Sequence, residues 1–454
     1  MHVKISSYSK KGHGLASCEE KKKKIQVMSA VIGDLLEIKI LHKRKGAYVS
    51  EILSIIQPSA DRVEPKCPHA EYCGGCTWQQ LQYKKQLAEK EKRIIQLFDA
   101  YREKIPPVFP SPEIWHYRNK MEFSFSEDKE GRPFLGLIAK GSKGRVMNLA
   151  FCELVDPMYM RILAEVRKWW RVNDLKAYRP NRDVGSLRTL TVRNSRKNNA
   201  WMVFLTVSGN PRYALTREQI KNFKDILLHI LPVEKTSIFL RIQSIAKGME
   251  TQFYEMHLHG PAYLHETLHV NHKQFHFYLS PASFFQPNSS AAEILFAKAL
   301  EAAAPSSSDQ VLDLYCGTGA FGMIFSPYVK NVIGIESNPY AVFDARLNLE
   351  ENGIKNMQVH QGDVGEVLKK LQGASTDLAI VDPPRIGLSP EAVRQLKKIK
   401  PKKILYVSCH PESQSDDVQQ LLDNYEISFI QPVDQFPHTP HIENILLLVR
   451  REVL

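Results

Sequence analysis

The pattern of hydrophobic and polar positions divides the chain into parts of different character. Residues 1–60 carry short β-rich runs separated by glycines, which is typical of a small antiparallel barrel. Strong helix formers dominate residues 79–101, and strand-like runs resume from residue 117 to about 271. We therefore expect three domains, with the helix packing on the last of them. Their expected bounds are 1–60 for the barrel, 61–275 for a central α+β domain and 276–454 for an α/β domain.

From Gln310 onward, strand-like runs alternate with helical ones. Strands are expected at Val311–Tyr315, Val332–Glu336, Met357–His360, Leu378–Asp382 and Ile404–Cys409. Helices are expected at Ala320–Tyr328, Pro339–Asn352, Gly365–Leu371, Pro390–Ile399 and Gln414–Leu422. This alternation predicts right-handed crossovers and a parallel, Rossmann-like sheet covered on both faces. The last two runs, Ile427–Val433 and Asn444–Arg450, predict an antiparallel edge.

Composition narrows the class of protein. With 43% hydrophobic and 24% charged residues in 454, the chain has the balance of a soluble globular protein. No segment approaches the ~20 apolar residues that a membrane span needs. The start of the chain lacks the pattern of a secretory signal, so we expect a cytoplasmic protein. We also expect a monomer.

The charge distribution favours a polyanionic partner. The net charge is +12, and residues 1–50 hold eleven Lys and Arg against four Asp and Glu. Such an excess suits RNA, although a solvated charged face would give the same pattern.

A glycine-rich turn follows the first strand of the last domain. Gly317, Gly319 and Gly322 satisfy G-x-G-x-x-G, and Glu336 ends the next strand, where it can accept hydrogen bonds from ribose hydroxyls. NAD and S-adenosylmethionine both fit this motif. The acidic Asp313 favours the second, because a carboxylate suits its cationic methionine moiety and repels a pyrophosphate.

Acidic residues end four successive strands. They are Asp313, Glu336, Asp363 and Asp382. Helix capping would explain any one of them. Together they predict a ligand site at the carboxyl edge of the sheet, with Asp363 placed to accept from an adenine amino group.

Cys409 ends the fifth strand, at the same edge. One interpretation is that Cys409 is a buried structural cysteine without a catalytic role. The other interpretation is that Cys409 is a catalytic nucleophile. A thiolate that adds to C6 of a uracil gives C5 carbanion character, so that C5 can take a methyl group, and a base must then remove the C5 proton. Glu443 is the candidate base, although a surface acid would look the same in sequence.

Four motifs carry a resemblance. D-L-Y-C-G-x-G at 313–319, D-P-P-R at 382–385, S-C-x-P at 408–411 and F-P-x-T-x-H-x-E at 436–443 resemble the RNA uracil-C5 methyltransferases. The resemblance implies Cys409 as nucleophile and Glu443 as base. It also implies donor-binding roles for Gln286, Tyr315, Gly317, Glu336, Asp363 and Asp382, with Gln286 and Asp382 also close to the uracil. The chain departs from the family pattern at four positions: His410, Ser413, Ser415 and Asp416 replace Asn, Thr, Ala and Arg.

Four cysteines form a candidate metal site. Cys67, Cys73, Cys76 and Cys152 suit either zinc or an iron–sulfur cluster, and an unmetallated group of buried thiols is the alternative. The C-x5-C-G-G-C pattern resembles the [4Fe-4S] site of ribosomal members of this family, and C-x3-C-x2-C of radical enzymes is absent.

The amino-terminal pattern adds a substrate expectation. Residues 1–60 resemble a TRAM domain, an OB-like RNA-binding barrel. With the cysteines, this resemblance implies the large-subunit (23S) rRNA branch, with tRNA as the alternative substrate. An NAD-linked oxidoreductase, a non-catalytic ribosome-binding protein and a cytosine-C5 methyltransferase remain competing hypotheses.

Overall fold

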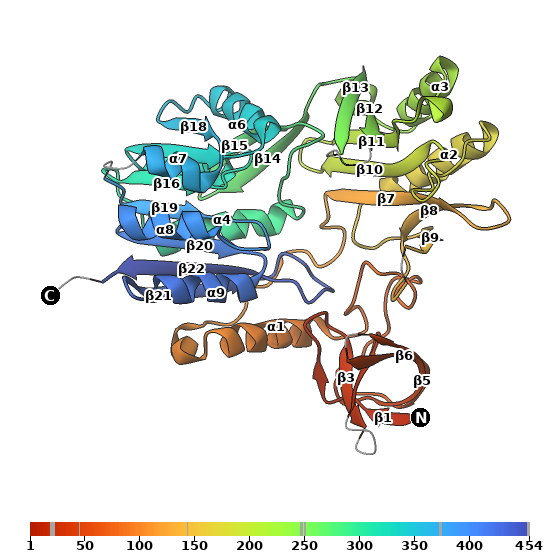
Figure 1. The fold of residues 1–454 in the computed structure, drawn as a ribbon, viewed down its shortest axis with the longest axis horizontal. Helices are drawn as coiled ribbons and strands as arrows, with labels where there is room; N and C mark the ends of the chain where they lie inside the picture. Colours follow the sequence, from red (N-terminus) through yellow and green to blue (C-terminus); the bar gives the residue numbers. More distant parts are fainter. Residues whose placement is uncertain are drawn as a thin grey trace.

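A computed structural model describes residues 1–18, 23–44, 46–142, 144–245, 248, 251–371 and 375–451 (Figure 1). Of the basic residues counted above, Lys21, Lys22 and Lys45 lie outside these ranges. Among the described residues, no helix is long and apolar enough to cross a membrane.

The first element is a curled six-stranded sheet. Its strands are β1 (His2–Lys4), β2 (Ser7–Tyr8), β3 (Gly14–Cys18), β4 (Lys23–Val27), β5 (Leu35–Arg44) and β6 (Ala47–Gln57). The order is β1-β5-β6-β4-β3-β2, and β4 runs parallel to β6. The expectation of a purely antiparallel barrel was therefore wrong, because a crossover brings β6 back beside β4. Alternate residues such as Ile25, Val27, Leu36 and Ile38 fill the concave side.

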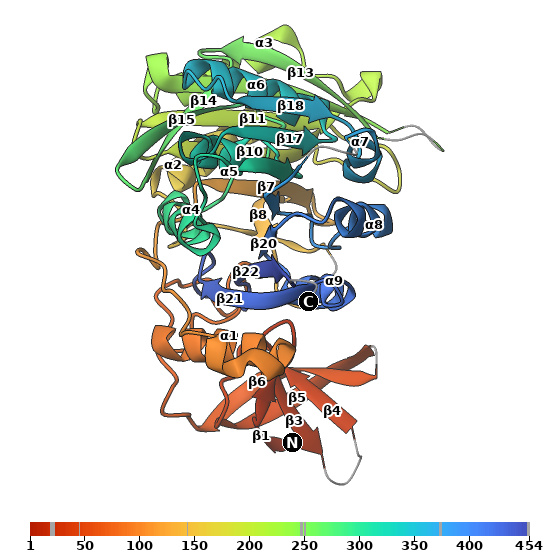
Figure 2. The same ribbon diagram turned by 90° about the vertical axis from the view of Figure 1, so that its left-hand side faces the viewer.

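Helix α1 (Tyr83–Leu97) follows, then a short 3-10 segment, η2 (Asp99–Lys104). The helix begins four residues later than expected, because the preceding segment makes turns and side-chain bonds instead: Leu81 N donates to Trp78 O, and Gln79 Oε1 accepts from Cys67 N. Figure 2 shows α1 lying between the curled sheet and the last sheet of the chain. Arg93 of α1 forms an ion pair with Glu412 across this boundary.

The middle of the chain forms a seven-stranded sheet in the order β13-β12-β11-β10-β7-β8-β9. Its strands are β7 (Lys120–Glu127), β8 (Pro133–Ile138), β9 (Val146–Asn148), β10 (Leu187–Ser195), β11 (Ala200–Ser208), β12 (Thr236–Ser244) and β13 (Gln252–His259). The helical segments are α2 (Met158–Val172), η3 (Pro211–Tyr213), α3 (Arg217–Leu228) and η4 (Val233–Lys235). Apolar residues of α2 and α3 pack on one face of the sheet, so the other face is free to meet the last part of the chain.

The hairpin of β14 (Leu264–Val270) and β15 (Lys273–Leu279) joins the two larger sheets. Its Phe275 and Phe277 share one core with Phe204 of the middle sheet and with Phe296 of α4 (Ser289–Ala303). The expected domain boundary after residue 275 falls inside β15.

The last part is the expected Rossmann-like sheet, ordered β18-β17-β16-β19-β20-β22-β21. Its strands are β16 (Gln310–Leu314), β17 (Asn331–Glu336), β18 (Met357–Gln361), β19 (Leu378–Val381), β20 (Lys403–Ser408), β21 (Tyr425–Val433) and β22 (Glu443–Arg450). Its helices are α5 (Ala320–Phe325), η5 (Ser326–Tyr328), α6 (Pro339–Glu351), α7 (Val364–Lys370), α8 (Pro390–Ile399) and α9 (Pro411–Leu421). The first five strands are parallel and β22 is antiparallel to β20, as the pattern predicted. Strand order reverses between β16 and β19, which is where such sheets bind ligands.

Candidate active site

The loop after β16 has a left-handed backbone at Tyr315, Gly317 and Gly319, whose φ angles are 62°, 54° and 85°. A Cβ at Gly317 would meet no atom within 4 Å, so open space lies over this part of the loop. Asp313 ties the end of β16 to helix α5 after the loop, because its Oδ2 accepts a 2.8 Å bond from Gly322 N in the first turn of α5. Burial raises the pKa of Asp313 to about 7, and its Oδ1 has no hydrogen-bond partner among the described residues.

Glu336 and Asp363 flank the same loop. Glu336 accepts from Gly317 N at 3.1 Å and from Asn338 N at 2.7 Å, so it ties the end of β17 to the glycine turn. Asp363 caps α7 by accepting from Glu366 N at 3.2 Å. The capping interpretation therefore applies to Asp363, which stands at the carboxyl edge of the sheet and is separated from the end of β18 by Gly362 alone. Tyr315 lies nearby: burial raises the pKa of its phenol, and Ser389 and Asp363 are among its polar neighbours.

Sheet register places Cys409 beside Glu443. Ser408 of β20 pairs with Asn444 of β22 in an antiparallel ladder, so the next residue of one strand faces the previous residue of the other. Asp382 directly follows β19, the other neighbour of β20. The thiol of Cys409 and the carboxyl groups of Glu443 and Asp382 therefore meet at one edge of the sheet.

Electrostatics within this cluster favours the protonated forms. Burial, followed by Glu443 and Asp382, raises the pKa of Cys409 to about 11. Burial and Asp382 hold the pKa of Glu443 well above its usual range, and burial raises the pKa of Asp382 to about 7. Arg385 opposes these shifts: it hydrogen-bonds to Cys409 and lowers the pKa of both Cys409 and Glu443.

Gln286 lies on a loop that several side chains hold in place. Asn119 donates two hydrogen bonds to the backbone of this loop: its side-chain Nδ2 donates to Gln286 O at 3.0 Å, and its backbone N donates to Pro287 O at 2.8 Å. Asn288 caps α4 and donates from Nδ2 to Gln435 O at 3.2 Å. This bond brings the loop of Gln286 against the segment that leads to Glu443.

The four metal-site cysteines line a single cavity of about 450 Å³. Arg385 and His441 line the same cavity, so it extends to the neighbourhood of Cys409. Burial raises the pKa of Cys76 to about 12 and that of Cys152 to about 11. In the part of the chain that the structure describes, however, no group of three or more Cys, His, Asp or Glu is arranged to hold a metal ion. The thiols share a cavity, but the expected assembled ligand set is not seen.

Sequence reasoning missed Arg385 as a site residue, although it stands in D-P-P-R and contacts Cys409. Two apolar side chains next to site residues are exposed, Ile386 at 87% and Phe284 at 68%. Single exposed apolar residues are common on protein surfaces, so this exposure alone assigns neither of them a function.

The departures from the family motif near Cys409 have local roles. His410 replaces an asparagine and still caps α9, because its Nδ1 accepts from Ser413 N at 3.3 Å. Ser415 Oγ donates to Leu97 O, which joins α9 to α1.

Comparisons with known proteins bear on the family and the fold. Residues 234–451 match the model of the tRNA (uracil-5-)-methyltransferase family. An uncharacterized RNA methyltransferase of Protochlamydia amoebophila is 43% identical over 440 residues, which cover 93% of this chain and 99% of that protein. One from Caldanaerobacter subterraneus is 33% identical, with 98% of each chain covered. Among solved structures, the tRNA (uracil-54, C5)-methyltransferase of Pyrococcus abyssi in complex with S-adenosyl-L-homocysteine superposes with a TM-score of 0.76 at 26% identity, covering 99% of this chain and 100% of that one.

Proposed function

The chain belongs to the family of S-adenosylmethionine-dependent RNA uracil-C5 methyltransferases, and we propose that its substrate is a uridine of 23S rRNA, with Cys409 as nucleophile and Glu443 as base. Family membership decides between the two ligands that fit the glycine turn, in favour of the methyl donor. The observation that carries the assignment of roles is the β20–β22 register, which sets the thiol of Cys409 beside the carboxyl group of Glu443.

The reaction assigned to these residues has three steps. The Cys409 thiolate adds to C6 of the uracil and places negative charge on C5 and O4. C5 then forms a bond to the methyl group of the donor as the bond between that methyl group and the donor sulfur breaks, and S-adenosylhomocysteine is the leaving group. Glu443 takes the proton that remains on C5, and the electron pair of that C–H bond restores the C5–C6 double bond as the thiolate leaves. The products are 5-methyluridine and S-adenosylhomocysteine; Cys409 is left as the thiolate, and Glu443 must lose the proton it has taken before another cycle.

Arg385 helps the first step. A thiol whose pKa is about 11 holds its proton at neutral pH, so the attack needs stabilisation of the thiolate. The guanidinium of Arg385 supplies a positive charge and a hydrogen bond to the sulfur. Deprotonation of Glu443 is likewise opposed by Asp382 and assisted by Arg385. Arg385 therefore stabilises the charged form of both reacting groups.

The donor-binding assignment rests on the loop after β16. S-adenosylmethionine, when bound, supplies an electrophilic methyl group and a positive sulfonium. The open space over Gly317, the unpartnered Oδ1 of Asp313 and the acidic Glu336 and Asp363 suit a cationic nucleoside there. Tyr315 and Asp382 border the same edge, and Gln286 is assigned to the space between donor and base.

We assign the cysteine cavity to a [4Fe-4S] cluster, with zinc as the alternative. Thiolates are ligands for either group, and the four thiols line one cavity, so binding would draw them together from the positions that the described structure shows. A bound metal would also drive their deprotonation. The cluster would order the segment from residue 67 to 76 next to the active site and would take no part in methyl transfer.

The choice of rRNA rests on the amino-terminal sheet and the cysteine motif together. In this proposal residues 1–60 contact RNA phosphates, residues 61–275 orient the RNA, and residues 276–454 hold donor and target base. A tRNA substrate is the second candidate, because the Pyrococcus abyssi tRNA enzyme matches this chain over nearly its full length.

Mapping 5-methyluridine in a deletion strain tests the substrate. Loss of the modification from one 23S rRNA position, restored by the parent gene, is the expected result. Loss from tRNA alone would reject the rRNA assignment in favour of the second candidate.

A matched pair of variants tests the base. Glu443→Gln keeps shape but loses basicity, so a covalent RNA–protein species that already carries the methyl group should accumulate. The control is Glu426→Gln, an exposed change on the neighbouring strand β21, which should turn over normally. Normal turnover by Glu443→Gln would exclude it as the base.

A further inference from the structure

His438 has a strained backbone in the segment that leads to Glu443. The segment 434–443 runs from the end of β21 to Glu443, the first residue of β22. At His438 the φ angle is 65°, in the left-handed region that residues other than glycine rarely adopt. Such a conformation persists only where the surroundings enforce it. Contacts from a distant part of the chain do so here.

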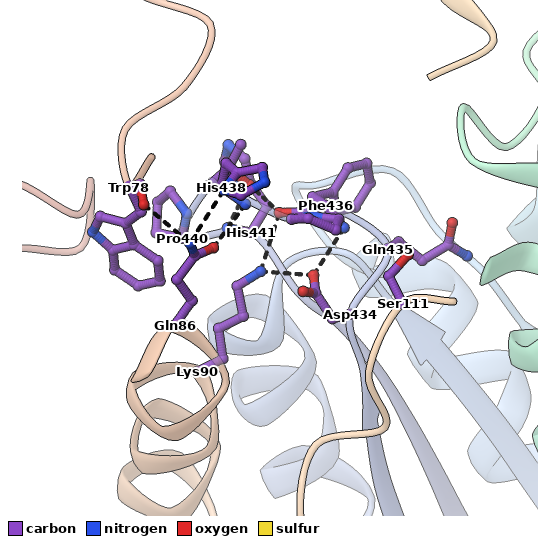
Figure 3. A network of polar contacts seen from close by, with 12 residues as sticks. Trp78, Gln86, Lys90, Ser111, Asp434, Gln435, Phe436, His438, Pro440 and His441 are labelled. Carbon is purple, nitrogen blue, oxygen red and sulfur yellow. Dashed lines mark hydrogen bonds and ion pairs between the residues drawn. The ribbon is translucent and has the colours of Figure 1, made fainter. Parts of the chain in front are cut away.

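Four residues clamp His438, and Figure 3 shows part of this arrangement. Thr77 N and Trp78 N both donate to His438 O, at 3.0 and 2.9 Å. Gln86 Oε1 accepts from His438 N at 2.7 Å, and Gln86 Nε2 lies 3.2 Å from the ring Nδ1. The imidazole stacks on Trp115, with 3.9 Å between ring centroids. The backbone donor, the backbone acceptor and the ring of His438 are therefore all engaged.

Gln86 is the centre of the clamp. Its side chain has no exposed area, and its Nε2 also donates to Trp78 O at 3.0 Å and Leu81 O at 2.8 Å. One amide thus joins helix α1, the Trp78 segment and His438. No other side-chain type of this size offers both the acceptor and the donors that these contacts use.

The clamp begins directly after a cysteine of the metal-site motif. Cys76 is followed by Thr77, the first residue that binds His438 O. The cavity of the cysteines is also lined by Phe436, Thr439 and His441 of the 434–443 segment. The position of the cysteine segment and the position of the segment that ends in Glu443 are therefore set by shared contacts.

We propose that Gln86 is a positioning residue of the methyltransferase reaction, which through His438 fixes the place of Glu443 and couples it to the cysteine segment. The inference rests on the proposed role of Glu443 as base. It requires that Gln86 act on removal of the C5 proton and leave donor binding and thiol addition almost unchanged. Small displacements of a reacting group cost large factors in rate, so loss of the clamp should slow proton removal about tenfold to a hundredfold.

The test compares Gln86→Leu with Gln96→Leu, a change at another glutamine of the same helix that is not buried. Three quantities are measured for each: affinity for S-adenosylhomocysteine by calorimetry, covalent trapping by RNA with 5-fluorouridine at the target, and the decay of the methylated adduct in a single turnover. For Gln86→Leu we expect the first two within about twofold of the parent and a decay slowed about tenfold or more. Gln96→Leu should match the parent in all three.

A second variant tests the same clamp in case Gln86→Leu does not fold. His438→Asn keeps a residue that tolerates the left-handed backbone and keeps the backbone N–H that binds Gln86 Oε1, but loses the ring with its stacking on Trp115 and its contact with Gln86 Nε2. Its adduct should also decay more slowly than that of the parent. Parental decay in Gln86→Leu, or an equal loss of all three quantities, would overturn the proposal, and if Gln86→Leu does not fold, His438→Asn decides alone.

Glu443→Gln in the same assay distinguishes the role of Glu443 as base from the positioning role of Gln86. Slow decay in Glu443→Gln with parental decay in Gln86→Leu would reject only the positioning role. Parental decay in Glu443→Gln would reject the base assignment itself.

Discussion

The ion pair of Lys90 and Asp434 joins helix α1 to the segment that leads to the proposed base. Lys90 Nζ donates to Asp434 Oδ1 at 2.7 Å and to Phe436 O at 3.1 Å, and both charged side chains have no exposed area. We expect Lys90→Met to destabilise this junction by about 3–5 kcal/mol, because it leaves a buried carboxylate without its counter-charge.

The control is an exposed pair with the same separation. Lys168 Nζ lies 2.7 Å from Glu165 Oε1, with side-chain exposures of 70% and 30%. Lys168→Met should cost less than about 1 kcal/mol, because solvent screens the pair. The contrast isolates burial, since the two pairs have the same distance.

Native-state hydrogen exchange is the assay, because it reports the opening of one segment of a multidomain chain. Peptides that cover 434–443 should exchange about two to four orders of magnitude faster in Lys90→Met, since each ~1.4 kcal/mol is a factor of ten. Peptides of the middle sheet should not change. An effect below about 1 kcal/mol on 434–443 would refute the argument that burial makes this pair strong.

The reverse variant has a definite pH dependence. Burial lowers the pKa of Lys90 and Asp434 opposes this, so Asp434→Asn should lower that pKa further. Between the lowered folded value and the unfolded value the unfolded chain binds more protons, and stability therefore rises with pH. The deficit of Asp434→Asn measured by denaturant unfolding should shrink as the pH rises toward the unfolded pKa of lysine, about 10.4, and a deficit that grows as the pH rises would contradict the sign.

Three further predictions concern the other sites. Alkylation of Cys409 in the free protein should quicken about tenfold per pH unit from about pH 7 to 10, because the thiolate reacts and burial raises the pKa to about 11; a plateau near pH 8 would contradict this. Replacing the exposed Lys10 and Lys11 by Gln should lower the slope of log affinity for RNA against log salt by about 0.7–0.9 for each phosphate that is no longer neutralised, and an unchanged slope would show that they are only solvated. Anaerobically purified protein should be brown with a broad charge-transfer band, whereas stoichiometric zinc without iron would reject the iron–sulfur assignment.

The local pattern of apolar and polar residues was sufficient to predict the strands of the Rossmann-like sheet. Strands β16 to β20 lie within one residue of the expected bounds, because buried parallel strands read as continuous apolar runs between glycines and prolines. The position of Cys409 at a strand end followed from the same pattern. Its neighbour Glu443 could be assigned only by motif, because pairing of β20 with β22 is a non-local contact.

What the sequence pattern missed depends on contacts between distant residues. The partners Lys90 and Asp434 are 344 residues apart, and Gln86 and His438 are 352 apart. The parallel pairing of β4 with β6 is likewise set by the way the sheet curls, since each strand alone fits an antiparallel ladder equally well. Periodicity describes one face of one element and carries no information on which distant side chain that face meets.

The nucleophile assignment is tested most directly with RNA that carries 5-fluorouridine at the target position, incubated with S-adenosylmethionine. Fluorine at C5 cannot be removed as a proton, so the parent protein should form a covalent species that survives a denaturing gel. Cys409→Ala should bind the RNA and form none. A trapped adduct with Cys409→Ala would contradict the assignment of Cys409 and show that another residue attacks the uracil.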